Sequence, residues 1–206
     1  MAELEPRMHT GELYSCNSPE LFREQMECRA LIHQYNQLDP RDMEGHQALL
    51  PRIFAEVGEN CFFEPPFNAN WGRYTHLGNN VYANFNLTLV DDTHVYLGDN
   101  VMIGPNVTIS TAAHPIHPGL RRLAAQYNKP VTIEKNVWIG AGCILLSGVT
   151  IGENSVIGAG SVVSRDIPAN VVAFGTPCRV VRPIDEKDLT TYDHGKPIDF
   201  SQWENL

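Results

Sequence analysis

A period of six residues runs through the second half of the chain and constrains its fold more than any other feature. Every sixth position from residue 133 is aliphatic, and this column consists of Ile133, Ile139, Leu145, Ile151, Ile157 and Val163. The pattern recurs upstream from Leu77, Leu97 and Ile103. A period of six fits neither an α-helix nor an antiparallel meander. It predicts short strands separated by turns and wound as a β-helix, with the aliphatic column pointing inward.

The six-residue pattern is interrupted twice. Val95 and Tyr96 are two extra residues before Leu97, and residues 115–130 do not fit the pattern at all. We predict that the second interruption, about residues 115–130, is a loop extruded from the coil. It begins within the sequence TAAHPIHPGLRR, residues 111–122, in which two histidines stand close together. Long loops in compact domains are often functional.

The two ends of the chain lack the repeat. Ser18 followed by Pro19 is a typical helix start. A second helix is expected after Asp39-Pro40, with Val57 among its buried residues and its end at Gly58. We therefore predict a helical segment over residues 1–58, the β-helix over 59–183 and an acidic surface extension over 184–206. The fold class is mainly β.

Charge and composition limit the classes of partner that the protein is expected to bind. The net charge of -9 argues against nucleic acid and requires a local basic cluster for any anionic ligand. No run approaches the length of a membrane span, and the N-terminus lacks the apolar core of a signal peptide. The five cysteines form no CxxC pair, which suits a reducing compartment. We expect a cytoplasmic protein with no nucleic-acid or membrane partner.

Several stretches resemble the maltose/galactoside O-acetyltransferases, a branch of the hexapeptide-repeat acyltransferase superfamily that also contains nodulation acetyltransferases. They are VGENCFFEPPF, LGNNVYANFNLTLVDD, IGPNVTISTAAHPIHP, GTPCRVVR and the repeats over residues 129–172. The resemblance spans roughly residues 11–183 and includes the N-terminal helices. It implies a left-handed parallel β-helix, a homotrimer with acetyl-CoA bound between neighbouring subunits, and no required metal.

The reaction of that family moves an acetyl group from CoA to a sugar hydroxyl. A hydroxyl is a poor nucleophile at neutral pH and needs a base within hydrogen-bond reach, a task that suits a histidine. The resemblance places this base at His114, the first histidine of HPIHP. The alternative is that His114 is only a turn residue, held out of helical geometry by Pro115. His117 is predicted to shape the loop.

On the acceptor side, the resemblance implies sugar contacts from Asn70, Tyr82, Asn84 and Asp92. Hydroxyl, amide and carboxylate groups bind sugar hydroxyls in defined directions. Asn84 is also expected to meet the acetyl end of the donor, although it could simply occupy a turn, and Tyr82 could be a core aromatic. Cys16 stands where relatives often have an aspartate, which leaves the identity of the sugar open.

On the donor side, the resemblance implies a channel for CoA. Arginines near the end of the coil form the basic cluster that the phosphates need. Small residues leave room for the pantetheine arm, but they are equally consistent with ordinary coil packing. Besides Asn84, the residues concerned are Ala141, Ala159, Ser164, Arg165, Arg179 and Arg182.

Two other classes of function remain compatible with a β-helix. A metal-dependent hydratase resembling the γ-class carbonic anhydrases would hold zinc through histidines. His76 and His94, 18 residues apart, would stack if each turn had three sides of six. A non-catalytic scaffold is the other class, but it has no use for the polar YANFN and HPIHP segments. The histidine pair at 114 and 117 and the N-terminal helices favour the acyltransferase.

Overall fold

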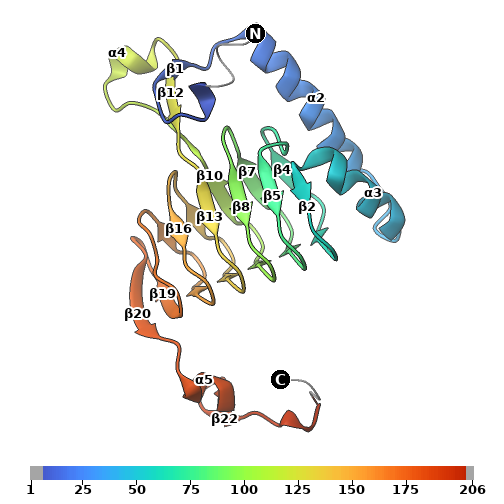
Figure 1. The fold of residues 1–206 in the computed structure, drawn as a ribbon, viewed down its shortest axis with the longest axis vertical. Coiled ribbons are helices and arrows are strands. Elements are labelled where there is room, and N and C mark those ends of the chain that lie inside the picture. The colour runs from blue at the N-terminus through green and yellow to red at the C-terminus, as the bar shows by residue number, and fades with distance from the viewer. Residues whose placement is uncertain (1–6, 203–206) are drawn as a thin grey trace.

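The computed structural model describes residues 7–202, so the outermost parts of both predicted terminal segments lie outside the described residues. The chain winds into a stack of coils with three parallel sheets as its sides, and two helices lie against the first coils (Figure 1). The predicted β-helix is therefore confirmed. Each turn visits the three sheets in the same order, and each sheet gains one strand per turn.

The strands are short and belong to the three sides in turn. The first sheet contains β2 (Glu56–Val57), β5 (Thr75–Leu77), β8 (Val95–Leu97), β13 (Val131–Ile133) and β16 (Thr150–Ile151). The second contains β3 (Phe62–Phe63), β6 (Tyr82–Ala83), β9 (Met102–Ile103), β14 (Trp138–Ile139), β17 (Val156–Ile157), β19 (Val171–Phe174) and β20 (Arg179–Pro183), the last of which is antiparallel to its neighbour. The third contains β4 (Asn68–Ala69), β7 (Thr88–Val90), β10 (Thr108–Ser110), β15 (Ile144–Leu145) and β18 (Val162–Val163).

The aliphatic column forms the core as predicted, and all six of its members from Ile133 to Val163 are 0% exposed. Asparagines turn the chain between the first and second sheets. Asn80, Asn100 and Asn136 have φ of 57 to 58°, a left-handed conformation that asparagine tolerates. Their side-chain amides bond from coil to coil at 2.9 to 3.0 Å. The corner is thus fixed by one residue type repeated along the stack.

The length of a turn changes along the stack. Leu77 pairs with Leu97, twenty residues on, whereas Ile133 pairs with Ile151, eighteen residues on. The two extra residues predicted before Leu97 are therefore confirmed, and Val95 and Tyr96 are strand residues of a longer coil.

The N-terminal helices are α2 (Pro19–Asn36) and α3 (Met43–Ile53). The Ser18 hydroxyl accepts a bond from the Leu21 amide at 3.3 Å, so the predicted helix start is confirmed. The second helix is shorter than predicted. Phe54 is extended, at φ -98° and ψ 154°, and leads the chain into β2, where Val57 lies.

The extruded segment is not an irregular loop. It contains β11 (Ala112–Ala113), the short helix α4 (Pro118–Arg121) and β12 (Ala125–Asn128), and β12 also pairs with β1 (Tyr14–Ser15). The N-terminal segment is thereby tied to the middle of the chain. His117 caps α4 by accepting the Gly119 amide at 3.1 Å, which supports its loop-shaping role.

The C-terminal extension leaves the last coil and contains α5 (Glu186–Thr190), β21 (Thr191–Tyr192), β22 (Lys196–Pro197) and the 3₁₀ turn η1 (Phe200–Gln202) (Figure 1). Over residues 7–202, no helix combines the length and the apolar character needed to cross a membrane.

Substitution of inward- and outward-facing isoleucines on neighbouring strands tests this arrangement of the core. Ile139 is 0% exposed and lies between Ile103 and Ile157 of the adjacent coils, whereas Ile144 is 41% exposed. We expect Ile139→Ala to lower the free energy of unfolding by about 2–5 kcal/mol, because it leaves a cavity. Ile144→Ala should cost less than about 1 kcal/mol. Urea denaturation measures both, and equal losses would contradict the inward column.

Candidate active site

His114 follows β11 and is held by the facing strand. Its Nδ1 lies 2.8 Å from the carbonyl oxygen of Ala125 in β12. A carbonyl oxygen only accepts, so Nδ1 carries the proton and donates it. In the neutral ring, Nε2 is then unprotonated and free to accept a proton. The side chain is exposed, which leaves this nitrogen within reach of a substrate.

A polar hollow of about 280 Å³ lies between the extruded segment, helix α2 and the coil. The strand that holds His114 also carries Gln126, which lines this hollow. Two predicted acceptor residues, Asn70 and Asp92, line it as well. The full lining is Met8, Tyr14, Cys16, Leu21, Phe22, Gln25, Asn70, Trp71, Asp92 and Gln126.

Asp92 is buried, with 8% of its surface exposed, and it accepts hydrogen bonds from the polar groups around this hollow. Its Oδ1 accepts bonds from Asn70 Nδ2 and Trp71 Nε1, both at 3.0 Å. Its Oδ2 accepts from Gln126 Nε2 at 2.8 Å. Both oxygens therefore already have protein donors, and the carboxylate fixes the orientation of two amides that face the hollow.

The other acidic groups of the hollow are kept neutral. Burial raises the pKa of Tyr14 to about 12, and burial also raises the pKa of the Cys16 thiol. Cys16 thus brings no charge to the hollow at neutral pH. The hollow offers hydroxyl, amide and thiol groups around one carboxylate, a set suited to a neutral polyol.

Asp91 lies beneath this hollow, and burial raises the pKa of its carboxyl to about 7. It accepts bonds from the Trp71 amide at 2.9 Å and the Thr75 hydroxyl at 3.0 Å. An unfolded aspartate titrates near about pH 3.9. Between these values the folded state holds a proton that the unfolded state has released, so stability falls as pH rises from about 4 to about 7.

Asp91→Asn should remove that contribution. We expect the difference in urea midpoint between the wild type and the variant to decrease as the pH rises from 4 to 7. Above pH 7 this difference should stay constant. Glu27→Gln, on the exposed surface of α2, should leave the pH profile unchanged. Parallel profiles of wild type and Asp91→Asn would show that Asp91 does not titrate in this range.

The predicted site residues lie at two different corners of the coil. Asn84, Ala141 and Ala159 follow strands of the second sheet, at the corner that leads into the third. Asn70 and Asp92 follow strands of the third sheet, and His114 follows β11, which comes directly after β10 of that sheet. About 20 Å of extended chain separates the two corners, since one side of the coil spans about six residues. One chain alone does not bring Asn84 and His114 together.

Both polar groups of Asn84 have defined directions. Its Oδ1 accepts the Phe85 amide at 2.7 Å, so the side chain does stabilise the turn, and its NH₂ group is left as a donor. Tyr82 is half-buried on the outer surface of β6 and is not a core aromatic. Its hydroxyl donates to Glu64 Oε1 at 3.3 Å, and burial together with Glu64 raises its pKa.

The predicted donor-binding residues are all exposed near the end of the coil. They are Ala141, Ala159, Ser164, Arg165, Arg179 and Arg182. Arg182 is already engaged, because its two terminal nitrogens each lie 2.6 Å from an oxygen of Asp188 in α5. The Arg182 guanidinium holds the pKa of Asp188 at about 2. An exposed pair of this kind is weak enough for a phosphate to displace.

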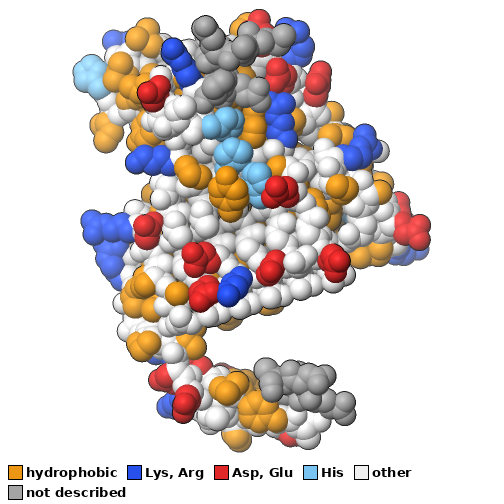
Figure 2. All heavy atoms as spheres, viewed as in Figure 1, with side chains coloured by type: hydrophobic (Ala, Val, Ile, Leu, Met, Phe, Trp, Pro, Cys, Tyr) orange, Lys and Arg blue, Asp and Glu red, His pale blue; other side chains and the backbone are white. Residues whose placement is uncertain are grey.

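Histidine side chains gather on one face of the molecule (Figure 2). His76 Nε2 lies 2.9 Å from His94 Nδ1, so the two side chains are in contact. The predicted one-turn register is wrong, because His76 pairs with Tyr96, twenty residues on. His9 contacts the His94 ring at 4.9 Å between centroids. Burial, together with His76, lowers the pKa of His94. Over residues 7–202, no group of three His, Cys, Asp or Glu side chains is arranged to hold a metal ion.

Sequence reasoning assigned no role to several residues of the hollow. Tyr14 reaches it through the pairing of β1 with β12, more than one hundred residues away in the chain, and its hydroxyl lies 2.7 Å from Gln126 Nε2. Phe22 and Gln25 reach it from α2. No local sequence pattern predicts these contacts, because each depends on packing between segments far apart in the chain.

Comparison with known proteins identifies the family to which the chain belongs. Residues 7–58 match the maltose acetyltransferase hexapeptide capping motif, and residues 130–165 match the bacterial transferase hexapeptide repeats. The chain is 57% identical to the galactoside O-acetyltransferase of Lactococcus lactis over 96% of both chains. It is 47% identical to that of Escherichia coli, over 90% of this chain and 92% of the relative. A solved galactoside acetyltransferase in complex with coenzyme A superposes with a TM-score of 0.89 at 46% identity, over 92% of this chain and 94% of that one. The chain therefore belongs to the maltose/galactoside O-acetyltransferase family.

Proposed function

We propose that the protein transfers an acetyl group from acetyl-CoA to a hydroxyl of a maltose- or galactoside-type sugar. The observation that carries this proposal is the bond from His114 Nδ1 to the carbonyl of Ala125, which leaves Nε2 as a base; the next residue of the same strand, Gln126, lines a polar hollow. The relatives named as galactoside O-acetyltransferases, and the relative solved with coenzyme A, support the choice of acceptor and donor.

In this mechanism the sugar hydroxyl attacks the thioester carbonyl carbon directly. His114 Nε2 takes the hydroxyl proton as the new C–O bond forms. The NH₂ group of Asn84 donates to the oxyanion of the tetrahedral intermediate. The C–S bond then breaks, and the imidazolium returns its proton to the departing sulfur. The Ala125 carbonyl keeps the ring oriented throughout.

These residues lie at two different corners of the coil. A complete site therefore requires a second copy of the chain. The outer face of the second sheet carries an apolar row in strand-to-strand register, an arrangement suited to a subunit contact. It consists of Phe62, Tyr82, Met102, Trp138, Val156 and Val172. We infer a homotrimer in which His114 of one chain meets Asn84 of the next, with acetyl-CoA between them.

A thiol-release assay across a panel of sugars tests the proposed reaction. Acetyl-CoA with maltose or a galactoside should release free CoA thiol in proportion to the acetylated sugar, which mass spectrometry identifies. Amine acceptors of similar size serve as the comparison for the reaction class. Release of thiol without an acetylated sugar, or acetylation of amines alone, would refute a sugar O-acetyltransferase.

Arg179→Ala tests the donor site. Arg179 is exposed, and among the described residues 7–202 its Nη1 donates only to the neighbouring Cys178 carbonyl, at 2.8 Å, so its charge is available to a phosphate. We expect the KM for acetyl-CoA to rise about tenfold, with kcat changed less than about threefold. Arg52→Ala, at the exposed end of α3, is the control and should leave both constants unchanged. An unaltered KM in Arg179→Ala would remove this residue from the donor site.

A further inference from the structure

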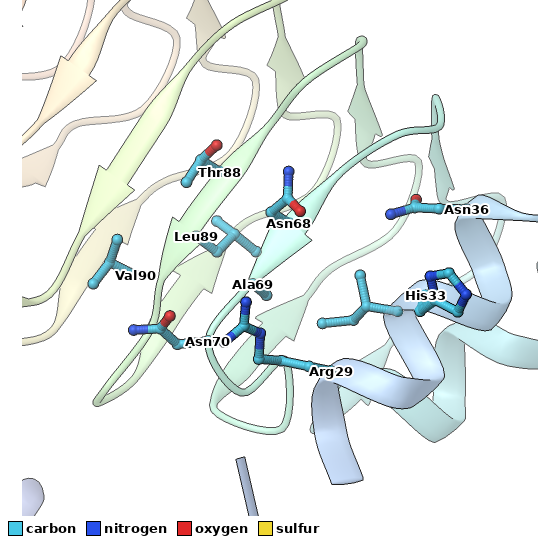
Figure 3. A pocket seen from close by; sticks show the side chains of 10 residues that line it. Arg29, His33, Asn36, Asn68, Ala69, Asn70, Thr88, Leu89 and Val90 are labelled. Atoms are coloured by element: carbon cyan, nitrogen blue, oxygen red, sulfur yellow. The ribbon is translucent and has the colours of Figure 1, made fainter. Parts of the chain in front are cut away.

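A second hollow, of about 270 Å³, lies where α2 crosses the outer face of β4 and β7 (Figure 3). Its polar lining comes from both sides: Arg29, His33 and Asn36 from the helix, and Asn68, Asn70 and Thr88 from the coil. The volume is near the small end of the range for ligand pockets, and the polar groups suit a hydroxylated ligand.

This hollow continues the first one, which Asp92 and Gln126 line. Asn70 lines both hollows, and its amide is fixed by Asp92. Helix α2 also lines both: Phe22 and Gln25 face the first, and Arg29, one turn after Gln25, faces the second. Residues three or four apart lie on the same face of a helix. The two hollows are therefore consecutive parts of one groove between α2 and the coil.

The charge of the second hollow is opposite to that of the protein as a whole. No carboxylate lines it, although the chain carries a net charge of -9. Arg29 extends from α2 toward β4 (Figure 3). Within residues 7–202, the Arg29 side chain is exposed and forms no ion pair. A guanidinium in this setting is suited to bind a carboxylate or phosphate through two hydrogen bonds.

Not every group in the lining is available to a ligand. The Asn36 amide donates to the Phe67 carbonyl at 2.7 Å, and its oxygen accepts the Phe67 amide at 3.1 Å. Asn36 therefore joins helix and coil and fixes the width of the groove. Arg29 and His33, both exposed, and Asn68 and Thr88 on the outer face of the third sheet are left to face a ligand.

We propose that the second hollow is a subsite for an acceptor unit that carries an anionic group, linked to the sugar that is acetylated beside His114. The proposal rests on the sugar O-acetyltransferase function proposed above. The acceptor then spans the groove, with its reacting unit in the first hollow, its second unit across Asn70, and its anion on Arg29.

Three disaccharides that differ only in the second unit test this subsite: a neutral hexose, a hexuronic acid and a hexose 6-phosphate. We expect at least one anionic acceptor to have a KM about tenfold lower than the neutral one, as a charge-assisted hydrogen bond implies. Arg29→Gln, which keeps the length of the side chain but removes its charge, should abolish this difference. Arg23→Gln, exposed on the same helix and lining neither hollow, should retain it. Comparison of the carboxylate and phosphate acceptors identifies the anion.

The outcomes separate the subsite from the reaction. Equal KM values for neutral and anionic acceptors, or a difference that survives in Arg29→Gln, overturn the subsite while leaving the reaction intact. Failure to acetylate any of the three overturns the reaction proposed for this chain. Calorimetric titration of the anionic disaccharides into wild type and Arg29→Gln then decides the subsite by binding alone.

Discussion

His114→Ala is expected to lower kcat by about 100-fold or more, because it removes the proposed general base for the attacking hydroxyl. The side chain is exposed, and its described hydrogen bond goes to the Ala125 carbonyl, so the fold should survive its removal. Affinity for acetyl-CoA, measured by calorimetry, should stay within about twofold of the wild type, because His114 acts on the hydroxyl proton and not on the donor phosphates.

His117→Ala is the matched control, since it removes a second histidine from the same segment. His117 caps α4 through the Gly119 amide and is not proposed to meet the substrate. Its loss should change kcat less than about threefold. If His114→Ala retains more than a third of the wild-type kcat, or if His117→Ala loses as much activity as His114→Ala, His114 is not the base.

The coil could be predicted from the sequence because each six-residue block repeats the same local pattern of a buried residue and a turn residue. An aliphatic residue such as Ile139 points inward, and an asparagine such as Asn136 turns the corner. The pattern predicted the inward column correctly, because burial and turn geometry both depend on residues close in the chain. The eighteen-residue turn assumed for His76 and His94 does not apply there, because the two extra residues Val95 and Tyr96 lengthen that turn to twenty.

The site was predictable only in part. The motif HPIHP indicated His114, but the tautomer of its ring depends on the Ala125 carbonyl, which faces it across a hairpin. Asp92 is predicted to meet the sugar, and its two oxygens also accept hydrogen bonds from protein donors, among them Asn70 and Gln126, from distant segments. Contacts of this kind follow from the meeting of three elements, and no six-residue pattern encodes them.

Mixed trimers of two inactive variants are expected to recover activity. Asn84→Ala removes the proposed oxyanion donor and should lower kcat by about 100-fold. His114→Ala lacks the proposed base. When the two are co-expressed in equal amounts with different affinity tags, some contacts join an intact His114 of one chain to an intact Asn84 of the next. Random assembly makes about a quarter of the sites complete in a cyclic trimer, so about a quarter of the wild-type activity should return.

This recovery depends on the positions of the two residues at different corners of the coil. If one chain supplied both groups, every site in a mixed trimer would lack one of them, and the mixture would be no more active than its parts. Co-expression of His114→Ala with a chain carrying both substitutions is the control, because no contact there has an intact His114. Activity near a quarter in the first mixture and near zero in the second would locate the site between subunits. Equal and negligible activity in both would confine each site to a single chain.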